Sequence, residues 1–398
     1  MARTNRRDVF EPDVVGIYHC INRCVRGAYL CGQDQSRRRN YEHRRGWVRL
    51  RLMLLVSIFA IDQLNFAFLG NHLHLLLRNR PDLRDRWSDE EVVRRWWRLC
   101  PQRRDKNGDA DELKPEELAE MLSDQNQVQE WRRRLGDISW FMKLLAENIA
   151  IRANQEERLP GQPALGRFWQ GRFTSQRILD EVGLLACSQY IDLNPIRARL
   201  AETPETSCFT SVFERIHSPS QAAELAANDL SLTAVDSLPY VCSDEWLAPV
   251  LLDERPQQQL EAPFSKPSEP ELSEPGLSAP AQSALAQSAS SQPRPLEPIR
   301  KRASDRGYLS MSFAKYLQLL DWTGREARAD KRGSIPDDLA PILERLQVKS
   351  EKWIDLVVNF RRSFATAVGS PQSLAVEAAR RGRKFLRGQR SAPAAFVT

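Results

Sequence analysis

Residues 70–77 read Gly-Asn-His-Leu-His-Leu-Leu-Leu and follow a segment rich in β-forming residues at 58–69. This pattern predicts two strands joined by a tight turn at the Gly-Asn pair. Side chains alternate along a strand, so His72 and His74 share one face while the leucines at 73, 75 and 77 enter the core behind it. With backbones roughly 7 Å apart, the two imidazoles can share one divalent cation. Two structural histidines are the alternative, because two ligands do not make a metal site.

The composition indicates a water-soluble, multidomain protein. The chain has 398 residues, 41% of them hydrophobic, which predicts two or three domains with substantial cores. No apolar run reaches the roughly 18 residues of a membrane span, and no apolar segment follows the basic N-terminus as in a signal peptide. Seven scattered cysteines do not form a disulfide framework. The spacing of Cys20, Cys24 and Cys31 fits no standard zinc pattern. We therefore expect a cytoplasmic protein without membrane contact.

The net charge of +6 is unevenly distributed along the chain. Residues 1–220 carry +5, residues 221–298 carry −9 and residues 299–398 carry +10. A basic front half and a basic tail, separated by an acidic spacer, suit a polyanionic partner. Charge alone does not distinguish DNA from RNA or from a membrane surface.

The segments around the histidine motif predict an α+β fold. A first strand is expected at 14–23, and a helix that Asp34 and Ser36 can cap is expected at 37–56. An amphipathic helix at 138–152 and a last strand within 166–179 complete the order β-α-β-β-α-β. This order predicts a ferredoxin-like or RRM-like antiparallel sheet covered by helices.

Composition shifts predict the boundaries of further parts. We expect the main domain at 12–217, with a helical insertion at 81–136 whose tryptophans and arginines pack into the core or stack on bases. Residues 218–253 are expected to form a peripheral extension, and residues 254–305 a disordered Pro/Ser-rich linker. Residues 306–390 predict a small all-α C-terminal domain, whose basic surface would hold DNA nonspecifically or dock a protein.

A second polar pair lies on a helix that Asp180 is expected to cap. Tyr190 and Asn194 are four residues apart and therefore share a face. If this helix packs beside the histidine strand, the phenol lies over the two imidazoles and Asn194 can supply an oxygen ligand. Such a donor set suits Mg²⁺ or Mn²⁺ with open positions for phosphate oxygens. A phenol, with a pKa of about 10, becomes an effective nucleophile only beside such a metal, and a tyrosine of the core is the alternative.

Four motifs of the sequence resemble those of a known enzyme family. Residues 18–23 read Tyr-His-Cys-Ile-Asn-Arg, residues 166–173 read Gly-Arg-Phe-Trp-Gln-Gly-Arg-Phe and residues 190–198 read Tyr-Ile-Asp-Leu-Asn-Pro-Ile-Arg-Ala. With residues 70–77, they resemble the single-tyrosine HUH transposases, and among these the REP-associated tyrosine transposases, relatives of the insertion-sequence-200-type enzymes. The resemblance spans about residues 12–215. The chain departs from the family pattern in its long insertion and in Arg199, where a glycine is usual.

The resemblance implies a metal-dependent single-stranded DNA endonuclease and strand transferase that acts on hairpin or repeat DNA. Tyr190 would be the nucleophile that forms a 5′-phosphotyrosine, and His72, His74 and Asn194 would hold Mg²⁺ or Mn²⁺. Such a protein would associate with the nucleoid and act as a monomer or a homodimer.

The same motifs supply candidate DNA-binding residues, namely Asn22, Arg23, Arg167, Trp169, Arg172 and Arg197. A second hypothesis is a protein that binds DNA hairpins without cutting them, but such a protein has no use for His72, His74 and Tyr190 together. A third, an RRM-like RNA binder, predicts aromatic residues where the histidines stand.

Overall fold

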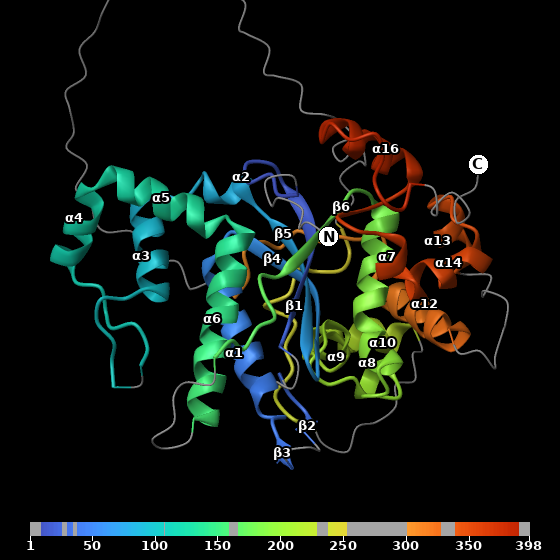
Figure 1. Ribbon diagram of the computed structural model, residues 1–398, viewed down its shortest axis with the longest axis horizontal. Coiled ribbons are helices and arrows are strands. Elements are labelled where there is room, and N and C mark those ends of the chain that lie inside the picture. Colours follow the sequence, from blue (N-terminus) through green and yellow to red (C-terminus); the bar gives the residue numbers. More distant parts are fainter. Residues whose placement is uncertain are drawn as a thin grey trace, which may run out of the picture.

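The computed structural model describes residues 9–25, 30–34, 38–106, 108–158, 166–228, 238–252, 301–327 and 339–389. At its centre lies a five-stranded sheet with the strand order β4-β5-β1-β6-β7 (Figure 1). Its strands are β1 (Gly16–Arg23), β4 (Ile61–Leu69), β5 (His72–Asn79), β6 (Thr174–Ile178) and β7 (Ala367–Val368). The first four strands pair antiparallel, and β7 pairs parallel to β6. The α+β fold with a mostly antiparallel sheet is therefore as the sequence predicts.

The hairpin β4-β5 forms where the sequence predicts it. Leu69 pairs with His72, so Gly70 and Asn71 alone make the turn. All nine residues of β4 are buried, which fits a strand that is covered on both faces. The leucines at 73, 75 and 77 join one hydrophobic cluster, whereas Leu76 joins the other. The alternation of side chains therefore separates the two faces of the sheet.

Two long helices cover the face of the sheet on which Leu73, Leu75 and Leu77 lie (Figure 1). These are α1 (Arg44–Ile58) and α6 (Ile138–Glu157), and α6 begins at the predicted residue. The predicted start of the helix at 37–56 is wrong, because Asp34 lies in β2 (Gln33–Asp34) and Arg39 in β3 (Arg39–Asn40). Arg38 between them has a φ of 52°, a left-handed conformation that a helix cannot contain.

The predicted insertion is helical within the described residues. It comprises α2 (Pro81–Arg84), α3 (Asp89–Leu99), α4 (Pro115–Ser123) and α5 (Gln125–Leu135). The ring of Trp96 stacks on that of Trp131, with centroids 5.8 Å apart, and the indole N–H of Trp97 donates to the carbonyl of Asp111 at 2.6 Å. These tryptophans hold the helices of the insertion together, which is the packing role that the sequence left open.

The second face of the sheet is covered by α7 (Glu181–Asp192), which the short helix α8 (Asn194–Arg197) follows. Oδ1 of Asp180 accepts a hydrogen bond from the backbone N–H of Gly183 at 2.9 Å, so Asp180 is the N-cap as predicted. The region after α8 contains the 3₁₀ helices η2 (Pro204–Thr206) and η3 (Pro219–Gln221) and the helices α9 (Ser211–Ile216) and α10 (Ala222–Ala227).

The C-terminal residues pack against α7 (Figure 1). They form α12 (Phe313–Glu326), α13 (Ala340–Arg345), α14 (Ser350–Val358), α15 (Phe360–Ser363) and α16 (Pro371–Arg380). Trp353, Phe360 and Phe364 belong to the same hydrophobic cluster as Leu185 and Ile191 of α7. Strand β7 also joins the sheet of the main domain. The residues predicted to form a separate C-terminal domain therefore share a core with the main domain.

The segment predicted as a linker falls largely outside the described residues, which resume at residue 301. Here the hydroxyl of Ser304 donates to the carboxylate of Asp62 on β4 at 2.8 Å, so residues 301–305 are held against the sheet. Leu251 and Leu309 form a bridge between the extension and the C-terminal residues. Within the described ranges, no helix has the length and apolar character needed to cross a membrane.

Candidate active site

The predicted catalytic and metal-binding residues meet on the face of the sheet that α7 covers. The imidazole centroids of His72 and His74 lie 4.9 Å apart on β5, and the ring of Tyr190 stands edge-on to His74 at 5.6 Å. The amide nitrogen of Asn194 lies 3.3 Å from Nε2 of His74. The geometry thus brings together all four residues that the sequence suggests. His72 and His74 come from β5, whereas Tyr190 and Asn194 come from α7 and α8, more than a hundred residues later.

A buried carboxylate fixes α7 in place just beyond Tyr190. Asp192 is fully buried and accepts hydrogen bonds from the side chains of Asn65 on β4 at 2.9 Å, Ser211 on α9 at 2.6 Å and Tyr316 on α12 at 2.7 Å. Burial raises the pKa of Asp192, while these hydrogen bonds act in the opposite direction. The end of α7 is therefore tied to three elements, which orients Tyr190 and Asn194 toward β5.

Burial keeps both histidines neutral. It lowers the pKa of His72 from 6.5 to about 4, with smaller contributions from the charges of Arg23 and Arg361. Burial likewise lowers the pKa of the fully buried His74 well below 6.5, and the neighbouring His19 and His72 act in the same direction. A neutral imidazole has a lone pair to offer, as a metal ligand must.

The phenol of Tyr190 is held in its neutral form. Its side chain is 7% exposed, and burial raises its pKa above 10. The hydrogen bond from Asn194 and the charges of Arg361 and Arg197 oppose this effect of burial. The guanidinium carbon of Arg197 lies 5.6 Å from the centroid of the Tyr190 ring. A nearby cation would favour the deprotonated form of this phenol.

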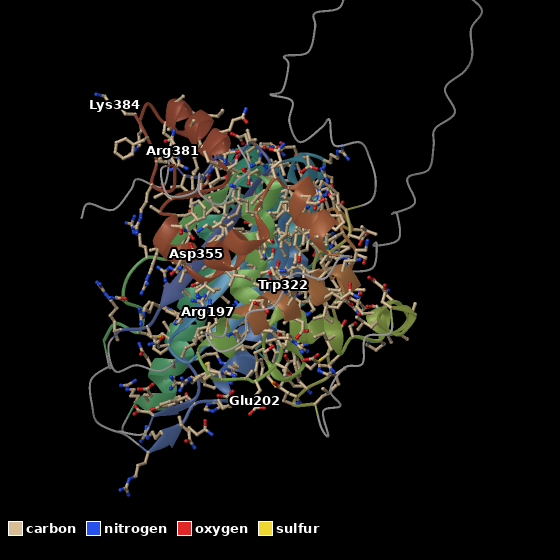
Figure 2. All side chains as sticks on the ribbon, turned by 90° about the vertical axis from the view of Figure 1, so that its right-hand side faces the viewer. Arg197, Glu202, Trp322, Asp355, Arg381 and Lys384 are labelled. Carbon is tan, nitrogen blue, oxygen red and sulfur yellow. The ribbon has the colours of Figure 1, made fainter. Side chains whose placement is uncertain are left out.

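A C-terminal residue covers the tyrosine. The fully buried ring of Phe360 stacks on Tyr190 at 5.1 Å between centroids, with 19° between the planes, and also lies 6.0 Å from His19. Arg197 donates from Nη2 to the carbonyl of Val358 at 2.7 Å, which links α8 to the end of α14. Figure 2 views this side of the molecule, with Arg197 near Asp355 of α14. Nothing in the local sequence signals this contact between segments so far apart.

A third histidine belongs to the cluster and was not among the predicted site residues. His19 on β1 is fully buried, and its Nε2 lies 2.9 Å from Nδ1 of His74. Its Nδ1 lies 2.9 Å from Oε1 of Gln176 on β6. The alternation along β1 could have indicated this position, because it places His19 on the face opposite Tyr18 and Cys20, which enter the other cluster.

The side chains at this site include donor atoms that a divalent cation can use. Among the described residues, no group of three or more His, Cys, Asp and Glu side chains is arranged to hold a metal ion. The donors at this site are instead two neutral imidazoles, from His72 and His74, and the carboxamide of Asn194 beside Nε2 of His74. Imidazole and carboxamide donors with remaining open positions are compatible with Mg²⁺ or Mn²⁺.

The six candidate DNA-binding residues do not form one surface. Arg197 lies at Tyr190, and the exposed Arg23 is paired with His72 in the β1-β5 register. Trp169 is buried on the other face of the sheet, where its indole N–H donates to the carbonyl of Ala146 at 2.7 Å. Arg167 is exposed in the loop before β6.

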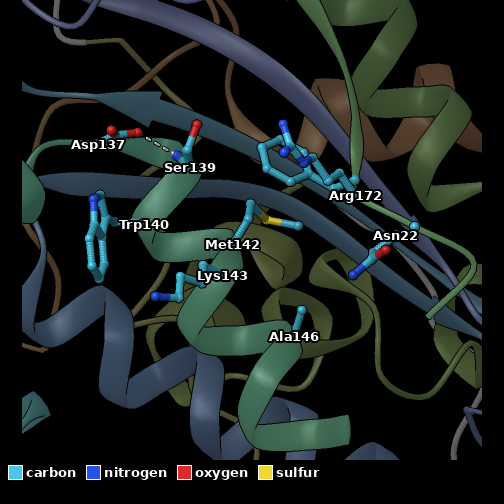
Figure 3. A pocket seen from close by; sticks show the side chains of 10 residues that line it. Asn22, Asp137, Ser139, Trp140, Met142, Lys143, Ala146 and Arg172 are labelled. Carbon is cyan, nitrogen blue, oxygen red and sulfur yellow. Dashed lines mark hydrogen bonds between the residues drawn. The ribbon is translucent and has the colours of Figure 1, made fainter. Parts of the chain in front are cut away.

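Asn22 and Arg172 lie at a cavity of about 430 Å³ on the α6 side. Figure 3 shows these two side chains opposite Trp140, Met142 and Lys143 of α6. This cavity is separated from the histidine cluster by the sheet, because Asn22 alternates with Ile21 and Arg23 along β1.

Comparison with known proteins adds one distant likeness. No family model and no curated protein matches the sequence. A solved structure described as a REP-associated tyrosine transposase bound to a REP hairpin aligns with 61% of this chain and 97% of that chain, at 10% sequence identity and a TM-score of 0.30. A TM-score this low carries no argument for this chain.

Proposed function

We propose that this chain is a metal-dependent, single-stranded DNA endonuclease and strand transferase of the HUH transposase type, acting on hairpin or repeat DNA. The observation that carries the proposal is the position of Tyr190 and Asn194 directly over His74, on the same sheet face as His72. The family resemblance of the motifs predicts this convergence from sequence alone. A structural core has no need for a buried tyrosine, two neutral histidines and an amide at one point.

In the proposed reaction, the phenol oxygen of Tyr190 attacks a phosphorus of the DNA backbone. The bond from phosphorus to the 3′-oxygen breaks, which leaves a 5′-phosphotyrosine and a free 3′-hydroxyl on the other strand end. A metal ion bound by His72, His74 and Asn194 would polarise the phosphate and stabilise charge on the departing oxygen. The energy of the broken ester is kept in the new ester, so the reverse attack by a 3′-hydroxyl joins strands without a nucleotide cofactor.

The surrounding residues have roles in binding and orientation. Asn194 donates a hydrogen bond to the phenol and orients it beside His74. Arg197 and Arg361 contribute positive charge near Tyr190, where the negative phosphate must lie. Arg23 contributes in the same way next to His72. Positioning and charge of this kind account for most of the catalysis in phosphoryl transfer.

One observation favours a second candidate function, a DNA-hairpin-binding protein without cleavage. Tyr190 is 7% exposed, and Phe360 lies flat on its ring. DNA reaches the phenol only if residues of α14 and α15 move away. A chain in which this cover never opens would retain DNA-binding surfaces but not the chemistry.

Formation of a covalent adduct distinguishes the two functions. The full chain is incubated with end-labelled single-stranded hairpin DNA and Mn²⁺, and the products are separated under denaturing conditions. We expect a labelled protein–DNA adduct that Tyr190→Phe abolishes with little loss of DNA affinity, because only one hydroxyl is removed. Tyr41→Phe is the matched control, since Tyr41 is also buried and its hydroxyl has no hydrogen-bond partner within the described structure. An adduct that persists in Tyr190→Phe would refute this role of Tyr190.

A further inference from the structure

Two hydrogen bonds connect three neighbouring strands on the active-site face of the sheet. His19 on β1 is directly opposite Gln176 on β6 in the strand register, and the β5 strand with His74 lies on the other side of β1. Nδ1 of His19 lies 2.9 Å from Oε1 of Gln176, and Nε2 of His19 lies 2.9 Å from Nδ1 of His74. Gln176 is 6% exposed and both histidines are fully buried, so water does not compete for these hydrogen bonds.

The direction of these hydrogen bonds follows from the amide side chains at the two ends of the series, those of Gln176 and Asn194. Oε1 of Gln176 is a carbonyl oxygen and can only accept, so Nδ1 of His19 must carry the proton. At the other end, the amide nitrogen of Asn194 can only donate, so Nε2 of His74 is an acceptor and the ring proton of His74 lies on Nδ1. Nδ1 of His74 must therefore donate to His19, which leaves the lone pair of His74 on Nε2, the atom beside Asn194.

We propose that His19 and Gln176 are positioning residues that hold His74 in the tautomer whose Nε2 lone pair faces Tyr190 and Asn194. This inference rests on the proposed function, in which His74 is a metal ligand through Nε2. With the opposite tautomer, Nε2 would carry a proton and could not bind a cation. The amide of Gln176 therefore determines, through two hydrogen bonds, whether the site accepts a metal ion.

The hydrogen bonds from His74 to His19 and from His19 to Gln176 also affect the charge of the site. Metal-binding histidines commonly donate to a carboxylate, which increases the basicity of the ligand. Here His74 donates to a neutral imidazole, and that imidazole donates to a neutral amide, so these hydrogen bonds add no negative charge at His74. His74 would therefore neutralise less of the positive charge of a bound metal ion, which would leave more of it to act on the phosphate. If His19 and Gln176 only filled the space between the sheet and the helix, their hydrogen bonds would not need a consistent direction.

The tautomer can be measured without metal or DNA. The chain has five histidines, so selective ¹⁵N-histidine labelling gives a small number of imidazole resonances, assigned by His→Gln substitutions. In the metal-free full chain, we expect the ¹⁵N shifts of His74 to show a protonated Nδ1 and an unprotonated Nε2. In Gln176→Leu, which removes the acceptor, we expect a mixture of tautomers at His74. Gln176→Glu retains an acceptor at this position and should restore the wild-type pattern.

Metal affinity provides the second measurement. Mn²⁺ binding, followed by the loss of its free-ion EPR signal, should weaken by about 10- to 100-fold in His19→Phe and Gln176→Leu, as usually occurs when the partner of a ligating histidine is lost. His43→Gln is the matched control, because His43 lies on the other side of the sheet, where its Nε2 is 2.7 Å from the carboxylate of Glu156 on α6. Wild-type His74 protonated on Nε2, or an unchanged tautomer in Gln176→Leu, would overturn the inference. The tautomer is measured without DNA, so the two experiments can fail independently. An absent covalent adduct would refute the proposed function, whereas the NMR result alone decides on the roles of His19 and Gln176.

Discussion

The stacking of Phe360 on Tyr190 yields a quantitative prediction about access to the phenol. Phe360 is fully buried and lies 5.1 Å from Tyr190 between ring centroids. Replacing a buried phenylalanine by alanine costs about 3 to 5 kcal/mol. In Phe360→Ala, most of this loss affects the contact between α15 and α7. The free energy needed to move α14 and α15 away from Tyr190 should therefore fall by about 3 kcal/mol. This corresponds to an increase in the open population on the order of 100-fold.

Nitration by tetranitromethane measures this opening, because the reagent must reach the ring of Tyr190. The modified residue is identified by peptide mass spectrometry, and the initial rate is compared between wild type and Phe360→Ala at a pH where both chains are folded. We expect the rate at Tyr190 to increase by on the order of 100-fold if opening precedes modification. The rate at the half-buried Tyr240 should stay unchanged.

Phe141→Ala controls for general loss of stability. Phe141 is also fully buried, but it lies on α6, on the opposite face of the sheet. Its replacement should cost a similar free energy of unfolding without exposing Tyr190 in the folded chain. Equal nitration rates at Tyr190 in wild type and Phe360→Ala would refute the idea that Phe360 limits access. Equal acceleration in both variants would attribute it to global unfolding.

Further outcomes are expected from the site and its supports. Asn194→Ala should lower the cleavage rate by about 10- to 100-fold, measured with hairpin DNA under single-turnover conditions, because an auxiliary ligand and the hydrogen bond to Tyr190 are lost. His19 has a pKa that burial lowers from 6.5 to about 3, so between these values the unfolded chain binds the extra proton. The free energy of unfolding should therefore fall as the pH decreases from about 6.5 towards 3, by up to about 1.4 kcal/mol per pH unit, and the urea midpoint of His19→Gln should fall less steeply. Glu214→Gln should lower the free energy of unfolding by about 3 to 5 kcal/mol in urea titrations, because it leaves the buried guanidinium of Arg49 without its carboxylate. Removal of all residues after 252 should destabilise the remaining chain and increase the binding of a hydrophobic dye, because the removed helices share a core with α7. A truncated chain as stable as the full one would contradict this packing.

The sequence by itself determined the features that depend on neighbours along the chain. The alternation after the Gly-Asn turn placed His72 and His74 on one face of a hairpin, because the strand repeat is fixed by backbone geometry. The cap at Asp180 is equally local. Tyr190 and Asn194 are neighbours along the chain, but the single helix expected to carry both is divided, because α7 ends at Asp192 and α8 begins at Asn194. From these patterns came the α+β sheet order and the four residues that meet at the site.

Only the tertiary structure decided what lies against that face. His19 joins His74 because β1 pairs between β5 and β6, and Phe360 covers Tyr190 because the C-terminal helices share its core. The start of α1 also depended on nonlocal context, since the ribbon β2-β3 replaced the helix expected around Arg39. Periodicity records which side chains of one segment share a face. It contains no information on which distant segment covers that face, because such pairing depends on the total apolar area that the folded chain can bury.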